Sequence, residues 1–215
     1  MIKSPFFVIE DAVSPAKCDV ITKQLGISVP SKDEAGYPLK HECFITDAEL
    51  VGYLQEAIMP SVGDMESRYG GAIKTFETPL FRQYFENPSR PCELHGCENA
   101  KFLRKKWVKV KDVDLVGYLW LKDFNSGVPL DPRFEVYGGK LEFPAYDFSL
   151  VPSRGTMVFF PAGPHFITAI SPVLVGSLEV VKISIKLHVQ DGFWEYKPEL
   201  FPGDYMQWFH SEEAQ

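Results

Sequence analysis

The sequence predicts a mainly β fold preceded by helices, and three observations indicate it. Short hydrophobic runs closed by Gly or Pro follow one another from residue 76 to residue 189. The most hydrophobic run, residues 114–121, is typical of a central buried strand. Helical periodicity is found before residue 76. Strands at this spacing, with turn signals between them, favour a sandwich, a barrel or a jelly roll.

Two helices are expected in the N-terminal third. The first should span residues 15–25, because Ser14 is a favoured N-cap and Pro15 suits the first helical position. The second should span residues 48–69 and be kinked or split near Pro60, which cannot donate a backbone hydrogen bond.

The remaining segments are assigned as strands or loops. Strands are expected over residues 6–9, 76–85, 114–121, 141–143, 156–160, 166–170 and 180–189, the second of them interrupted by Pro79. A long loop rich in Gly, Pro and Asp is expected over residues 122–136.

The composition fits one folded domain and argues against several classes of protein. The chain has 215 residues, 45% of them hydrophobic, which is enough for a sizeable core. A formal net charge of -7 disfavours nucleic acid as a partner, since sequence-independent binding needs a basic face. The N-terminus does not read as a signal peptide, and no run approaches the roughly 18 apolar residues of a membrane span. We therefore expect a cytoplasmic protein with no membrane partner.

Several stretches in the C-terminal two-thirds carry a resemblance to a known family. They are LVGYLWLKD at residues 115–123, YGGKLEFP at 137–144, PSRGTMVFFP at 152–161, then His165, and the turn Pro172-Val173 to Gly176. In order and spacing they resemble the iron(II)- and 2-oxoglutarate-dependent oxygenases, in the prolyl 4-hydroxylase-like branch.

The resemblance implies a fold and a division of the chain. The fold is a double-stranded β-helix, the cupin-like form of jelly roll, in a single domain over residues 1–215. Residues 76–190 would form the β core, with the strand and helices of residues 1–75 packed on it. Residues 191–215 form a strongly aromatic tail, which we expect to pack on the domain or to bind a partner, including a second copy or another assembly partner.

The resemblance also implies a function. Its members are dioxygenases that hydroxylate a C–H bond, here of a prolyl or other peptide side chain, with iron(II) as metal, 2-oxoglutarate as cosubstrate and ascorbate as a reductant. The alternative is a non-catalytic protein that keeps the fold as a binding or assembly module, because folds outlast activities.

The implied metal ligands include a departure from the family pattern. His165 matches the distal histidine, and His95 matches the first residue of the proximal His-x-Asp pair. Strict spacing places Cys97 where the family has Asp, so Glu98, next to Asn99, is the carboxylate candidate. Two histidines and one carboxylate suit iron(II), whereas a thiolate is soft and easily oxidised. The other reading is a surface loop with a degenerate site.

Cys92, His95 and Cys97 also permit a different metal site. Their side-chain types are zinc ligands, and a fourth ligand would have to come from elsewhere, with His41, Cys43 and His165 as candidates.

The cosubstrate requires a cation for its distal carboxylate. The resemblance points to Lys182 with Ser184, with Lys186 as an alternative, and to Tyr84 as a hydrogen-bond donor. Lys182, Ser184 and Lys186 share one face of a strand. That face could instead be a polar outer surface, and Tyr84 could be a core aromatic.

Overall fold

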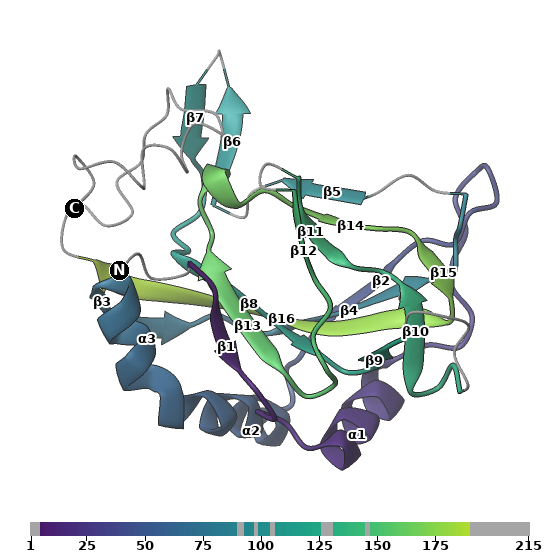
Figure 1. Cartoon of the computed structure of the whole chain (residues 1–215), viewed down its shortest axis with the longest axis horizontal. Helices are drawn as coiled ribbons and strands as arrows, with labels where there is room; N and C mark the ends of the chain where they lie inside the picture. Colours follow the sequence, from purple (N-terminus) through teal and green to yellow (C-terminus); the bar gives the residue numbers. More distant parts are fainter. Residues whose placement is uncertain are drawn as a thin grey trace.

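The computed structural model of the chain describes residues 5–89, 93–96, 99–103, 106–125, 131–144 and 147–189, without the side chains of 93–96, 100–103, 106–109, 165 and 189. Figure 1 shows a β body with the helices along one side of it. None of the helices in this part of the chain combines the length and apolarity needed to cross a membrane.

A seven-stranded sheet forms the centre of the structure. Its order is β1-β13-β8-β16-β4-β2, and β3 pairs with the later part of β16. All of its neighbouring strands are antiparallel. The strands are β1 (Phe7–Ile9), β2 (His41–Phe44), β3 (Gly71–Phe76), β4 (Leu80–Phe85), β8 (Leu115–Trp120), β13 (Met157–Pro161) and β16 (Ser177–Val189).

Smaller sheets face or flank the large one. One has the order β12-β11-β14-β5, another the order β15-β10-β9, and β6 and β7 form a hairpin. Their strands are β5 (Glu93–Gly96), β6 (Ala100–Leu103), β7 (Lys106–Lys109), β9 (Asp123–Phe124), β10 (Glu135–Gly138), β11 (Leu141–Phe143), β12 (Phe148–Leu150), β14 (Thr168–Ile170) and β15 (Val173–Val175). The arrangement is a double-stranded β-helix, so the expected fold class is confirmed.

The helices begin and end where the sequence signals lie. The helix α1 (Pro15–Leu25) starts at Ser14, whose side chain accepts a hydrogen bond from the Lys17 N–H. The expected second helix is split into α2 (Ala48–Ile58), the 3-10 turn η1 (Met59–Ser61) that contains Pro60, and α3 (Val62–Tyr69). The predicted break at Pro60 is therefore confirmed.

Buried apolar side chains form two clusters, one on each face of the large sheet. The outer cluster joins the three helices to residues such as Leu119 and Val181. The inner cluster fills the space between the sheets and includes Tyr118, Val180 and Phe143. Since alternate residues of a strand point to opposite faces, β8 and β16 contribute to both clusters. The predicted buried central strand is β8, all of whose residues are buried.

Three sequence-based assignments are corrected. The expected strand over residues 76–85 is interrupted at Pro79, as predicted, but its first part belongs to a separate strand, β3, that begins already at Gly71. The expected loop over residues 122–136 contains β9 and the start of β10. The strand assigned to residues 180–189 begins at Ser177, directly after Gly176.

A buried ion pair fixes the start of β16. Lys122 and Glu179 are 4% and 2% exposed, and the Lys122 Nζ lies 3.0 Å from the Glu179 Oε1. Ser177 and Gln83 donate hydrogen bonds of 2.8 and 3.1 Å to the same Glu179 oxygen. The Thr22 hydroxyl of α1 donates to the other, at 2.7 Å. The network therefore ties α1 to the large sheet.

We expect Glu179→Gln to lower the free energy of unfolding by about 3–5 kcal/mol, because the Lys122 ammonium is left buried without its counter-charge. Urea denaturation of the full chain measures this change. Asp131→Asn is the control, since it breaks an ion pair whose Arg133 side chain is 79% exposed, and it should leave the midpoint almost unchanged. A Glu179→Gln midpoint equal to that of the control would mean that the Lys122–Glu179 pair does not stabilise the fold.

We expect Gly117→Ala in β8 to be destabilising by about 1–3 kcal/mol, because a new Cβ would lie 2.2 Å from the Phe159 ring. Gly52→Ala in α2 is the matched control: its Cβ meets nothing within 4 Å, so the better helix propensity of Ala should stabilise the protein. Chemical denaturation of both variants tests the opposite signs.

Candidate functional site

The inner face of the large sheet carries buried polar side chains. Lys182 and Ser184 of β16 are 7% and 8% exposed, and Tyr84 of β4 is 6% exposed. They share this face with Leu178 and Val180, which belong to the inner cluster. The reading of this face as a polar outer surface is therefore wrong for Lys182 and Ser184, which are buried, whereas Lys186 is half-buried and His188 is exposed.

Arg82 and Tyr118 are polar neighbours that the sequence reading missed. Arg82 is 8% exposed and lies two residues before Tyr84 in β4, so it shares the inner face. Its Nη1 donates a 3.2 Å hydrogen bond to the Tyr118 hydroxyl. Its Nε lies 2.7 Å from the Glu42 Oε1 as an ion pair that lacks hydrogen-bond alignment. The two-residue spacing of Arg82 and Tyr84 in a predicted strand could have assigned Arg82 to the face of Tyr84 from the sequence.

Strand register fixes the level of each polar residue. Lys182 lies opposite Tyr118, and Ser184 lies opposite Val116, which in turn pairs with Phe160 near the end of β13. The chain then enters the 3-10 turn η3 (Pro164–Phe166), which contains His165. The polar part of β16 is therefore the part nearer to η3.

The first inner positions of β16 are apolar. Gly176, with φ of +84°, is the single residue between β15 and β16, so the turn is tight and not an extended hairpin. Leu178 follows it on the inner face, opposite Tyr84, and is 1% exposed. Lys182 is thus only the third inner position of β16, after Leu178 and Val180. The family resemblance leads one to expect the cation nearer to Gly176.

The two histidine-bearing segments lie side by side in the smaller sheet. His95 is in β5, which pairs with β14, and the register places Gly96 opposite Thr168. His165 precedes Thr168 by one short turn, in η3. On the other side, the Asn99 backbone N–H donates a 3.4 Å hydrogen bond to the Ala162 carbonyl. Gly96 therefore pairs with Thr168, which follows His165, and Asn99 contacts Ala162, which precedes it.

Asn99 holds a buried amide oxygen at this point. The residue is 8% exposed, and its Nδ2 donates a 3.0 Å hydrogen bond to the Val113 carbonyl. Its Oδ1 is buried without a hydrogen-bond partner among the described residues. Since a buried acceptor normally has a donor, this oxygen is consistent with a bound water or ligand beside the segment.

The three expected metal ligands lie largely outside the described atoms. Glu98, like Cys92 and Cys97, is outside the described residues, and the side chains of His95 and His165 are not described. Among the side chains that the structure does describe, no three of His, Cys, Asp and Glu gather to hold a metal. The predicted iron site and the zinc alternative both stay predictions.

The remaining candidates have other surroundings. Lys186 forms an ion pair with Asp112. His41 Nε2 lies 3.1 Å from the Leu25 carbonyl oxygen, next to α1. Burial raises the pKa of the Cys43 thiol, and burial, opposed by Arg154, raises the pKa of Cys18 to about 11. Both groups are therefore neutral thiols at neutral pH in the metal-free protein.

No family model and no curated protein sequence matches the chain. Solved structures do match its fold. A viral collagen prolyl hydroxylase from Paramecium Bursaria Chlorella virus-1, in complex with 2OG, has a TM-score of 0.60 and 17% identity, over 87% of this chain and 97% of that chain.

Two further structures extend the likeness. A prolyl hydroxylase from Trichoplax adhaerens, in complex with a hypoxia inducible factor peptide fragment, has a TM-score of 0.52 and 10% identity, over 85% of this chain and 83% of that chain. HygX from Streptomyces hygroscopicus, with nickel and 2-oxoglutarate bound, has a TM-score of 0.52 and 7% identity over the same shares of 85% and 83%. At these identities the likeness shows a shared fold.

Proposed function

We propose that the protein is an iron(II)- and 2-oxoglutarate-dependent dioxygenase that hydroxylates a C–H bond, with a prolyl or other peptide side chain as its substrate. The shared fold supports the class, since the similar structures include two prolyl hydroxylases and a protein with nickel and 2-oxoglutarate bound. The complex of one of them with a peptide fragment supports the substrate class.

The observation that carries the proposal is the combination of two features at one end of the inner face. The segments that bear His95 and His165 are neighbours through the β5–β14 pairing. Lys182 and Ser184 are buried on the facing sheet, in the part of β16 nearest to η3. A dicarboxylate that reaches a metal at the histidines needs such a cation and hydroxyl for its far end.

The metal would be held by His95, Glu98 and His165, a donor set that suits iron(II). The unpartnered Oδ1 of Asn99, one residue after Glu98, fits a polar group in this region. Lys182 and Ser184 would bind the distal carboxylate of 2-oxoglutarate, and Tyr84 would donate a hydrogen bond to the cosubstrate. Bound iron(II) and 2-oxoglutarate supply the oxygen-activating chemistry of such an enzyme.

A non-catalytic module with this fold is the second candidate. Leu178 and Val180 are buried at the inner positions that directly follow the Gly176 turn, where the family resemblance leads one to expect a cation. An apolar interior there is what a protein without the cosubstrate would show, and the fold alone does not require activity.

We expect anaerobic iron(II) with 2-oxoglutarate to give a metal-to-ligand charge-transfer band in the visible spectrum of the wild-type protein. His165→Ala and Glu98→Gln should abolish the band, because each removes one of the proposed ligands. Cys97→Ser is the matched control and should keep it. If wild type gives no band, the non-catalytic module becomes the better account, and a band lost only in Cys97→Ser would move the ligand to the thiol.

We expect Lys182→Met to weaken 2-oxoglutarate binding about ten- to hundredfold, since a charge-assisted pair contributes roughly 1.5–3 kcal/mol. Calorimetric titration of the metal-loaded protein measures the affinity, and iron(II) binding should be nearly unchanged. Lys186→Met is the control, because Lys186 pairs with Asp112. A loss in Lys186→Met but not in Lys182→Met would reassign the role.

A further inference from the structure

A hydrogen bond on the inner face of the large sheet bridges the strand β16. Arg82 of β4 lies opposite Val180 of β16. Tyr118 of β8 lies opposite Lys182, on the other side of the same strand. The Arg82 Nη1 donates to the Tyr118 hydroxyl at 3.2 Å. Because both side chains belong to the inner face, this bond passes over β16 between the levels of Val180 and Lys182.

The bridge divides the inner face of β16 into a polar and an apolar part. Lys182 and Ser184, both buried, lie on the side of the bridge that is nearer to η3. On the other side, the inner positions of β16 are apolar, beginning with Val180, and belong to the inner cluster. The polar part of this face therefore ends at the pair of Arg82 and Tyr118.

Two cationic side chains are buried at this boundary. Arg82 and Lys182 are 8% and 7% exposed, and they lie on neighbouring strands. Glu42 is the carboxylate beside Arg82, but its side chain is 34% exposed on the edge strand β2, and it is shared with Lys40 at 3.6 Å. Burying two cations close together costs free energy through lost hydration and mutual repulsion, so a bound anion would stabilise this part of the interior.

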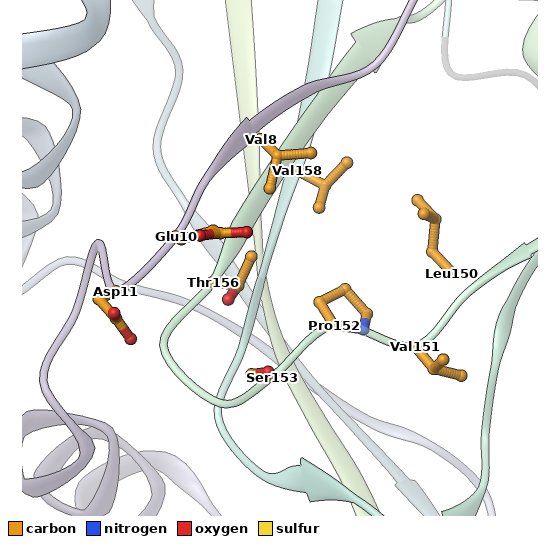
Figure 2. A pocket seen from close by; sticks show the side chains of 9 residues that line it. All are labelled: Val8, Glu10, Asp11, Leu150, Val151, Pro152, Ser153, Thr156 and Val158. Atoms are coloured by element: carbon orange, nitrogen blue, oxygen red, sulfur yellow. The ribbon is translucent and has the colours of Figure 1, made fainter.

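The opposite edge of the sheet is unsuited to an anion. The row of paired residues that contains Tyr118 continues to Val158 of β13 and then to Val8 of β1. Figure 2 shows Val8 and Val158 beside each other, where they line a cavity together with Glu10 and Asp11. These two carboxylates are the charged groups of that lining, and they repel an anion. An anion is therefore attracted to the part of the interior formed by β4 and β16.

We propose that Arg82, together with Lys182, binds the distal carboxylate of the 2-oxo acid cosubstrate and limits the length of that acid, a role that rests on the proposed function. The planar guanidinium has paired N–H donors that match the two oxygens of a carboxylate. Tyr118 and Glu42 are positioning residues, because they hold the guanidinium from its two sides. An acid longer than 2-oxoglutarate would have to place its carboxylate beyond the bridge, among apolar side chains, where a charge is costly.

The test is a calorimetric titration of the iron(II)-loaded full chain, without oxygen, with three 2-oxo acids. 2-Oxoadipate is one methylene longer than 2-oxoglutarate, and 2-oxobutyrate lacks the distal carboxylate. We expect wild type to bind 2-oxoglutarate about tenfold or more tightly than either of the others. Arg82→Met should weaken 2-oxoglutarate binding about tenfold and bring its affinity close to that for 2-oxoadipate. The affinity for 2-oxobutyrate should stay within about twofold, because this acid has no carboxylate for Arg82 to bind.

Three further variants separate binding from folding. Arg82→Lys keeps the charge without the planar fork, so its loss of 2-oxoglutarate affinity should be smaller than that of Arg82→Met. Tyr118→Phe removes the bridge and keeps the ring, so it should mainly reduce the preference for 2-oxoglutarate over 2-oxoadipate. Arg133→Met is the matched control, since it removes an arginine whose side chain is 79% exposed, and it should change none of the affinities. If Arg82→Met does not fold, Arg82→Lys and Tyr118→Phe provide the same test through the ratio of the two affinities.

Two results would exclude Arg82 from the site while keeping the proposed function. One is a wild-type protein that binds 2-oxoglutarate with an affinity that Arg82→Met leaves unchanged. The other is an equal loss for 2-oxoglutarate and 2-oxobutyrate in Arg82→Met, which indicates a structural effect and not a contact with the distal carboxylate. If wild type binds none of the three acids, the proposed function is overturned together with this role of Arg82.

Discussion

The structure depends on a strand that is buried on both of its faces. β16 is 13 residues long and pairs with β8, β4 and β3, so it holds the large sheet together. Its residues Val181, Ile183 and Ile185 pack under the helices, and its even-numbered residues from Leu178 to Ser184 face the second sheet. A slip of one residue would exchange these two sets and bury Lys182 and Ser184 under the helices. The register of this strand therefore decides which polar groups reach the interior.

Local signals explain why the helices could be predicted from the sequence. Ser14 and Asp47 satisfy N–H groups of their own helices, and Pro60 interrupts the second one, so each boundary depends on residues a few positions away. β3 could not be found in this way, because the mixed pattern of residues 71–76 becomes a strand through pairing with residues 185–189 of β16. Pairing between segments so far apart leaves no trace in the local pattern.

For the candidate cosubstrate residues of β16, the sequence predicts which side chains share a face but not what covers that face. The alternation of residues 182–188 assigns Lys182 and Ser184 to one face, but it does not say whether that face meets solvent or a second sheet. Only the packing of β11 and β14 over β16 answers this question. Arg82 was missed for a related reason, since an arginine in a strand is usually solvated and only its burial makes it part of the interior.

The network around Glu179 has a consequence for local motion. Thr22 of α1 and Lys122 after β8 meet at the same carboxylate, so α1 cannot detach without exposing the start of β16 to water. The two elements should then open as one cooperative unit, and their amide protons should exchange with solvent at a common rate. Amide exchange in α1 would then measure the opening of a strand whose Glu179 lies 157 residues after Thr22.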